Sequence, residues 1–179
     1  TMEHLFLVAV STGLAVALGV PTALYLTRRP RLAKPVIGFA SVMQTVSLQD
    51  TLRFEKSESV SISSQNGEWE AEKSLVSRVV SLVQREYGAE KGVKISVEKN
   101  IPLLSGLGGD SSDAAAVILG LNELWRLNLS PETMRRLAAE LGSDFSFFLT
   151  GGTSLAEGRG EVITPLPPFP RRHVILVLP

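Results

Sequence analysis

The residues best suited to chemistry lie in one glycine-rich stretch at positions 102–116, which reads Pro-Leu-Leu-Ser-Gly-Leu-Gly-Gly-Asp-Ser-Ser-Asp-Ala-Ala-Ala. Three of its residues between 106 and 109 are glycines, and glycine lacks the Cβ atom that keeps an anion away from backbone N–H groups. A helix that starts directly after such a turn presents free N–H groups and the positive end of its dipole, both of which bind phosphate. The stretch therefore predicts a phosphate-binding loop followed by a helix over 111–125.

Two structural alternatives compete with phosphate binding. A glycine-rich loop can be only a turn, and Ser-Ser-Asp can be only the cap of a helix. The stretch also lacks the Gly-Lys-Ser/Thr ending of Walker ATPases and the Gly-x-Gly-x-x-Gly spacing of dinucleotide-binding folds. The local pattern alone leaves phosphate binding and a structural turn equally open. The candidate binding residues are Leu104, Ser105, Gly106, Leu107, Gly108, Gly109, Asp110, Ser111 and Ser112, and the last two can add hydroxyl donors or a magnesium ligand.

Two aspartates in or after this stretch have ordinary structural explanations. Asp113 falls in the first turn of the predicted helix, where compensation of the helix dipole is a sufficient role. Asp144 precedes the segment 145–148, and capping a turn is a common use of aspartate. From the residues alone, neither carboxylate requires a catalytic role.

The composition excludes several classes of function. The 18 Lys and Arg residues balance 18 Asp and Glu residues, so no net field attracts the chain to nucleic acid. Cysteine is absent, which excludes disulfides, thiolate metal sites and cysteine nucleophiles and is compatible with a reducing compartment. The two histidines, His4 and His173, lie near opposite ends of the chain and suggest no metal site.

From Thr45 onward, the hydrophobic pattern predicts one α/β domain within residues 40–179. Alternation of apolar and polar residues is typical of half-buried strands, and apolar spacings of three and four are typical of amphipathic helices. Asn66-Gly67 predicts a hairpin turn, Gly88 ends the first helix, and Ser130 and Pro131 begin the last one. The expected strands are 45–54, 59–63, 93–98, 153–157, 161–164 and 173–178, and the expected helices are 70–87, 111–125 and 131–141.

Residues 1–39 have a different character. The run from Leu5 to Leu26 contains no charged residue and is long enough to cross a bilayer as a helix. A basic flank follows it, and such a flank normally stays in the cytoplasm. We therefore expect one membrane helix over 5–26 with residues 40–179 in the cytoplasm, and a buried helix of a soluble protein is the alternative. With its flank of Arg28, Arg29, Arg31 and Lys34, the segment resembles the opening helix of osmoprotectant-type ABC transporter permeases.

The pattern Pro-x-x-x-Gly-Leu-Gly-Gly-x-Ser-Ser-Asp-Ala-Ala, at positions 102–115, is similar to the central motif of the GHMP kinases. Further blocks at 41–48, 122–125, 141–148 and 151–161 extend the resemblance through nearly all of 40–179. The Ser-Ser-Asp-Ala-Ala-Ala form looks most like that of the 4-diphosphocytidyl-2-C-methyl-D-erythritol kinases. The resemblance implies the α/β fold of this superfamily's N-terminal domain, which is ribosomal protein S5 domain 2-like, and it implies ATP and Mg²⁺ as cofactors.

The same resemblance implies a reaction and a catalytic residue. GHMP kinases transfer the γ-phosphoryl group of ATP to an alcohol, which in the most similar members is the 2-hydroxyl of the cytidylyl methylerythritol substrate of non-mevalonate isoprenoid synthesis. Asp144 matches the aspartate that deprotonates or orients this hydroxyl, a task that needs a carboxylate within hydrogen-bond reach. The resemblance favours this role over capping. Homoserine and mevalonate kinases share the loop, and only the flanking blocks argue against them.

Three features depart from the family pattern. Asp110 stands where most relatives have a further glycine, and we expect it to point outward because an inward carboxylate would repel phosphates. Ser146 replaces a usual proline and is expected to loosen the turn after Asp144. Residues 1–39 stand where relatives carry a lysine-bearing strand. We therefore expect little or no kinase activity from this chain, and the alternative hypotheses are a fragment of an osmoprotectant permease and a non-functional fusion.

Overall fold

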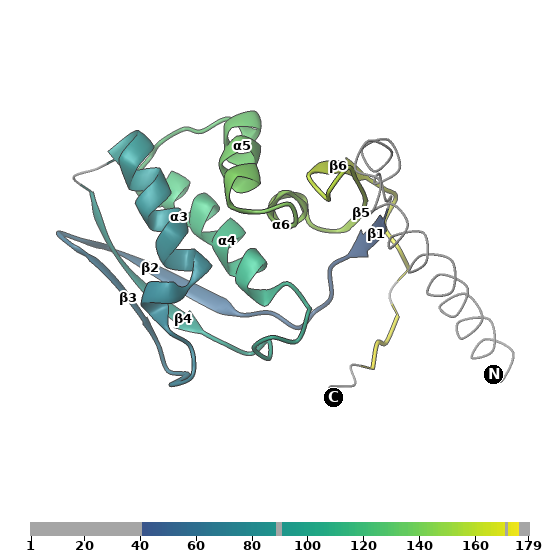
Figure 1. The fold of residues 1–179 in the computed structure, drawn as a ribbon, viewed down its shortest axis with the longest axis horizontal. Coiled ribbons are helices and arrows are strands. Elements are labelled where there is room, and N and C mark those ends of the chain that lie inside the picture. The colour runs from purple at the N-terminus through teal and green to yellow at the C-terminus, as the bar shows by residue number, and fades with distance from the viewer. Residues whose placement is uncertain (1–40, 89–90, 171, 176–179) are drawn as a thin grey trace, which may run out of the picture. The chain divides into compact units, whose positions relative to one another are not determined.

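Two three-stranded sheets and the helices packed on them make up the part of the chain that the computed structural model describes, residues 41–88, 91–170 and 172–175 (Figure 1). All of these residues belong to one compact unit, Ala40–Pro179. The mixture confirms the predicted α/β class. The strands are β1 (Ser41–Gln44), β2 (Thr51–Ser57), β3 (Val60–Ser64), β4 (Gly92–Glu98), β5 (Thr153–Glu157) and β6 (Val162–Pro165). The helices are α3 (Leu75–Val83), α4 (Gly109–Leu124), α5 (Pro131–Leu141) and α6 (Phe145–Thr150), and a 3₁₀ turn (Ala71–Lys73) and a π-helical turn (Gln84–Gly88) flank α3.

The first sheet has the strand order β2-β4-β3 and buries one of its faces. Its central strand, β4, runs antiparallel to β2 and parallel to β3. Along β4, Val93, Ile95 and Val97 are buried and alternate with the exposed Lys94 and Glu98, as the period-two pattern predicts. Helices α3 and α4 lie side by side over the sheet (Figure 1), and their buried side chains join those of β4 in one core.

A close backbone approach at Gly92 allows β2 and β3 to flank β4. Only Glu58 and Ser59 connect these two strands, yet the strands lie on opposite sides of β4. A Cβ atom at Gly92 would lie 2.5 Å from backbone atoms of Ser57, Glu58 and Ser59. Because no side chain fits there, only glycine lets the connection pass across the start of β4.

The predicted hairpin at Asn66-Gly67 is wrong. A turn is present, since the Asn66 side chain accepts a hydrogen bond from Glu68 N–H (3.0 Å) and the Asn66 carbonyl accepts one from Trp69 N–H (3.2 Å). The turn leads from β3 towards α3, however, and the chain returns to the sheet as β4, parallel to β3. A parallel pair requires a crossover of this kind, whereas a hairpin joins antiparallel strands.

The expected strand over 45–54 is only partly formed: residues 51–54 belong to β2, and a strand that was not predicted, β1, lies just before the expected range. Residues 41–44 form β1, which pairs with β5 in the second sheet of order β1-β5-β6, and residues 51–57 form β2 in the first. Residues 45–50 connect the two strands without regular structure. The expected strand at 173–178 is also wrong for residues 173–175, which are not in a strand, and residues 176–178 lie outside the described part.

The helices agree more closely with expectation. α5 spans the predicted residues 131–141, and Ser130 Oγ accepts a hydrogen bond from Thr133 N–H (3.2 Å) as its N-cap. The helical segment that contains α3 ends at Gly88, and α4 begins two residues before the predicted start. Residues 145–150 form the helix α6 instead of a turn. Ser146 is buried within this helix, and its expected loosening of the segment after Asp144 stays a prediction.

The predicted membrane helix over 5–26, its basic flank and the permease-like segment 1–39 lie outside the described residues. Within the part that the structure does describe, no helix is both long enough and apolar enough to cross a membrane. The resemblance of residues 1–39 to a permease therefore stays a prediction.

Candidate functional site

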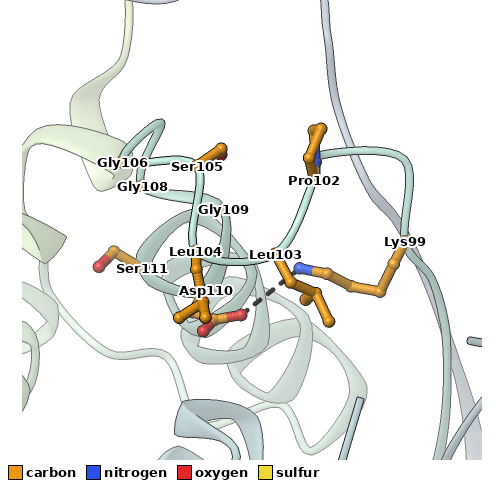
Figure 2. A pocket seen from close by; sticks show the side chains of 10 residues that line it. All are labelled: Lys99, Pro102, Leu103, Leu104, Ser105, Gly106, Gly108, Gly109, Asp110 and Ser111. Atoms are coloured by element: carbon orange, nitrogen blue, oxygen red, sulfur yellow. Dashed lines mark ion pairs between the residues drawn. The ribbon is translucent and has the colours of Figure 1, made fainter. Parts of the chain in front are cut away.

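The glycine-rich stretch forms the connection from β4 to α4 and encloses a small pocket. Gly106 and Gly108 have φ values of +74° and +73°, a left-handed conformation that glycine adopts without strain, and Gly108 is the N-cap residue of α4. Leu104 also has a positive φ of +57°, and its side chain is fully exposed. Figure 2 shows the loop lying over the start of the helix, around a pocket of about 130 Å³. The pocket is lined by Lys99, Pro102, Leu103, Leu104, Ser105, Gly106, Gly108, Gly109, Asp110 and Ser111.

The backbone at the start of α4 is available to an anion. Among the described residues, no acceptor is hydrogen-bonded to the N–H groups of Gly109, Asp110 and Ser111. The first helical hydrogen bond is donated by Ser112 N–H to Gly108 O (2.8 Å). Three free N–H groups and the dipole of a 16-residue helix favour an anion at this point, and phosphate binding by the loop stays a prediction.

Two of the candidate binding residues face a second, larger pocket instead. Leu107 and Ser112 line this space of about 600 Å³, and Ser112 Oγ donates a hydrogen bond to Gly109 O (2.7 Å). The Ser112 hydroxyl proton is therefore used within the helix, whereas Ser111 lines the small pocket. Gly106 lines both pockets, so they adjoin at the loop. The larger pocket is also lined by Met43, Gln44, Thr45, Val46, Leu48, Gln49, Asp50, Leu52, Ile101, Asp113, Ala116, Phe147 and Phe148.

Gly108 is the point at which the loop meets α6. A Cβ atom at Gly108 would lie 2.7 Å from Phe148 Cζ and 2.9 Å from Phe148 Cε2. A Cβ atom at Gly106, which has nearly the same φ, would meet nothing within 4 Å. A side chain at Gly106 would therefore cause only the strain of a left-handed backbone, whereas one at Gly108 would also overlap the aromatic ring.

We expect Gly108→Ala to lower the free energy of unfolding by about 2–5 kcal/mol, because left-handed strain of about 1–2 kcal/mol adds to overpacking of about 1–3 kcal/mol. Gly106→Ala carries the strain without the overlap and should cost only about 1–2 kcal/mol. Urea unfolding followed by circular dichroism measures both losses. Equal losses in the two variants would show that Phe148 does not restrict the loop.

A buried lysine beneath the loop was not among the residues that the sequence singled out. The Lys99 side chain, directly after β4, is 1% exposed. Its Nζ lies 2.6 Å from Asp50 Oδ2, 2.8 Å from Asp113 Oδ2 and 3.5 Å from Asp110 Oδ1. Asp50 in turn accepts hydrogen bonds at Oδ1 from the N–H groups of Asn100 (2.5 Å) and Ile101 (2.7 Å). This Lys99 cluster ties residues 45–50 to the base of the loop and to α4.

The cluster corrects two expectations about aspartates. Asp113 is buried against Lys99, so compensation of the helix dipole is not a sufficient account of it. The expectation that Asp110 points away from the loop is also wrong. Its carboxylate lies at the small pocket and is paired with Lys99 (Figure 2), while its side chain remains 54% exposed.

Burial and ion pairing oppose each other in the pKa values of the Lys99 cluster. Burial raises the pKa of Asp113 to about 6, although the hydrogen bond from Lys99 acts in the opposite direction. Burial also raises the pKa of Asp50, but the N–H of Ile101 and the ammonium of Lys99 outweigh it and hold the pKa below its usual value. For Lys99, burial lowers the pKa, but the hydrogen bond to Asp113 and the ion pair with Asp50 outweigh burial and raise it. Lys99 therefore stays charged at neutral pH.

Asp144, the proposed catalytic residue, occupies the N-cap position of α6 but makes no capping hydrogen bond with its side chain. Its Oδ1 accepts a hydrogen bond from Ser143 Oγ (3.3 Å), and the residue is exposed. Asp144 lines neither of the two pockets. It is linked to them through α6, because Phe147 and Phe148 line the larger pocket and Phe148 is close to Gly108.

Comparison with known proteins shows what the loop and the helices around it are similar to. Residues 74–152 match the family model of the GHMP kinases N terminal domain. The chain is 48% identical over 139 residues to a Dehalococcoides mccartyi protein named 4-diphosphocytidyl-2-C-methyl-D-erythritol kinase, across 78% of this chain and 49% of the relative. It is 43% identical over 143 residues to the protein of the same name from Caldicellulosiruptor saccharolyticus, with the same coverage of 78% and 49%.

A solved structure supports the same relationship. The crystal structure of a 4-(cytidine 5'-diphospho)-2C-methyl-D-erythritol kinase is 36% identical and has a TM-score of 0.62, over 72% of this chain and 46% of that one. The chain spans about half the length of the curated relatives that it matches. Residues 74–152, which hold the loop, α4 and α6, are thus similar to the GHMP kinases N terminal domain, and the described residues have the mixed α/β fold of a GHMP kinase.

Proposed function

We propose that this chain supplies the nucleotide-binding part of an ATP-dependent kinase that phosphorylates the 2-hydroxyl of 4-diphosphocytidyl-2-C-methyl-D-erythritol. The observation that carries the proposal is the set of free N–H groups at the start of α4, beside a pocket at the loop, in a chain 48% identical to a protein of that name. Such a kinase would act in isoprenoid precursor synthesis by the non-mevalonate route.

The residues at the small pocket fit the phosphates of ATP. The N–H groups of Gly109, Asp110 and Ser111 are free, and at Gly106, where a Cβ atom would meet nothing within 4 Å, the missing side chain leaves the backbone open to an anion. Bound ATP supplies the phosphoryl group, and Mg²⁺ neutralises part of its charge. Among the described residues no three acidic, histidine or cysteine side chains are placed to hold a metal ion, so Mg²⁺ would be held largely through the phosphates and the Ser111 hydroxyl.

The larger pocket is the proposed place of the alcohol substrate, because it adjoins the small pocket at Gly106. Its apolar wall includes Phe147 and Phe148, and Gln49 offers an amide group for hydrogen bonds, whereas the Gln44 amide is bonded to Thr45 and Thr153. Asp144 is the proposed base, and because it does not line the larger pocket, the reacting hydroxyl of the substrate would extend from that pocket to the start of α6. In support, its exposed carboxylate has only a neighbouring serine hydroxyl as a hydrogen-bond partner among the described residues, and it begins the helix that contacts Gly108.

Nucleotide binding and substrate choice test the proposal. We expect the 179-residue chain to bind ATP with Mg²⁺ in isothermal titration, with a 1:1 stoichiometry. Turnover is best measured in a chimera in which residues 40–179 replace the matching half of the D. mccartyi relative. The chimera should transfer label from γ-labelled ATP to the cytidylyl substrate but not to homoserine. Failure of the chain to bind ATP would exclude the proposed function, and transfer to homoserine alone would exclude the proposed substrate.

A further inference from the structure

We propose that Asp110 makes nucleotide binding at this loop depend on a divalent cation, because it places a carboxylate at the phosphate pocket that Lys99 cannot neutralise. The inference rests on the proposed function. Asp110 is the second residue of α4 and lines the small pocket together with Ser111 and the loop glycines. Its side chain is 54% exposed, so its charge faces both the pocket and solvent.

The positive charge of Lys99 is already shared with two buried carboxylates. Lys99 Nζ lies 2.6 Å from Asp50 Oδ2 and 2.8 Å from Asp113 Oδ2, and both of these side chains are at most 2% exposed. Asp110 is the third and most distant carboxylate, at 3.5 Å (Figure 2). Among the described residues that line the small pocket, Lys99 alone carries a positive charge. The pocket and the Lys99 cluster together therefore hold more negative than positive charge.

This charge balance acts differently on free ATP and on its magnesium complex. The free N–H groups of α4 attract a phosphate, but Asp110 lies in the first turn of the same helix and cancels part of the attraction. A triphosphate without its cation also meets direct repulsion from the Asp110 carboxylate. The magnesium complex carries two fewer negative charges and meets less of it. Asp110 thus selects for the cation-bound nucleotide.

The experiment compares the dissociation constant for ATP in EDTA with that in Mg²⁺, for the full chain and three variants. Asp110→Asn removes the charge and keeps the size of the side chain, while Asp110→Gly removes the side chain. Glu55→Gln is the matched control. Glu55 lies on β2, its side chain is exposed to a similar degree, and it is paired with a lysine, because its Oε2 lies 3.2 Å from Lys94 Nζ. All three substitutions change the net charge by the same amount.

We expect both Asp110 variants to bind metal-free ATP about 3–10-fold more tightly than the wild type at low salt, with less than a twofold change for the magnesium complex. Glu55→Gln should behave as the wild type, and the difference should shrink at high salt because the Asp110 charge is exposed to screening. The inference would be overturned if the ratio of the ATP dissociation constant in EDTA to that in Mg²⁺ were unchanged in the Asp110 variants. It would also be overturned if this ratio fell only because the magnesium complex bound more weakly. If the wild type binds no ATP in either condition, the proposed function fails instead.

Discussion

Replacing Lys99 with methionine is expected to lower the free energy of unfolding by about 3–5 kcal/mol near neutral pH, because a buried ion pair that loses one partner leaves an uncompensated charge. Here the loss affects two carboxylates, Asp50 and Asp113, which are both almost fully buried. Methionine preserves most of the volume of the side chain, so the loss reports charge and hydrogen bonding more than packing. Urea unfolding of the full chain, with the slope checked for constancy, measures it.

The loss should become smaller as the pH falls. Asp113 has a folded pKa of about 6, above its ordinary value of 3.8, so its contribution to stability is present below the lower value and is lost as the pH rises through the upper one. The contribution of Asp50 depends on pH in the opposite direction: its pKa is lowered in the folded protein, so its contribution to stability is lost as the pH falls. Without Lys99, burial acts unopposed on Asp113 and raises its pKa further, whereas the N–H groups of Ile101 and Asn100 still oppose burial at Asp50. Lys99→Met should therefore recover part of its stability at about pH 5, where Asp113 can take up a proton.

Two further variants make the Lys99 prediction specific. Lys94→Met removes a lysine from β4 whose partner, Glu55, is 60% exposed, and it should cost less than about 1 kcal/mol. The triple variant Lys99→Met, Asp50→Asn, Asp113→Asn removes all three buried charges and should regain most of the stability that the single change loses. A single variant as stable as Lys94→Met, or a triple variant no more stable than Lys99→Met, would contradict the role assigned to the cluster.

The glycine turn and the helix start that follows it could be predicted from the sequence because everything that defines them is contiguous. The glycines, the helix start and the two serines lie within seven positions, 106–112, and the conformations they favour are local. The helix α5 was predicted for the same reason, since Ser130 and Pro131 mark its start. Even here, the direction of the side chains could not be predicted from the local sequence. Whether Ser111 or Ser112 faces the small pocket depends on the rotation of α4 against its neighbours.

The Lys99 cluster could not be predicted because its members come from three separate segments. Lys99 follows β4, Asp50 precedes β2, and Asp113 lies in α4. In the sequence, Lys99 is one of several charges around a strand, and nothing distinguishes it from the exposed Lys94. Only the antiparallel pairing of β2 with β4, which places Thr51 opposite Glu98, brings Asp50 beside Lys99.

The strand order could not be predicted either, because it also depends on contacts between distant segments. Period-two alternation shows that a segment is extended, but it does not show which strand lies beside it. The two-residue link at Glu58 and Ser59 suggests a hairpin, whereas Gly92 allows the link to pass across β4 instead. The role of Gly92 becomes visible only when the strand order is known. The misplaced turn at Asn66-Gly67 follows from the same missing information.

Replacing Asp144 with asparagine is expected to lower the turnover of the chimera with the D. mccartyi relative by about 10²–10⁴-fold, the usual contribution of a positioned acid or base. Asparagine fills the same space and still accepts the hydrogen bond from Ser143, but it cannot accept the proton of a substrate hydroxyl. ATP binding should change less than twofold, because Asp144 lines neither the small pocket nor the larger one.

Glu157→Gln is the control for Asp144→Asn, since Glu157 is another exposed carboxylate and lies at the end of β5, outside the lining of both pockets. It should leave turnover and ATP binding unchanged. If Asp144→Asn keeps full turnover, Asp144 is only the first residue of α6. If turnover and ATP affinity fall together, Asp144 acts on the position of Phe148 against Gly108, and through it on the loop. Only a loss of turnover with intact ATP binding assigns the proton to Asp144, because that step alone requires a carboxylate that the bound nucleotide does not need.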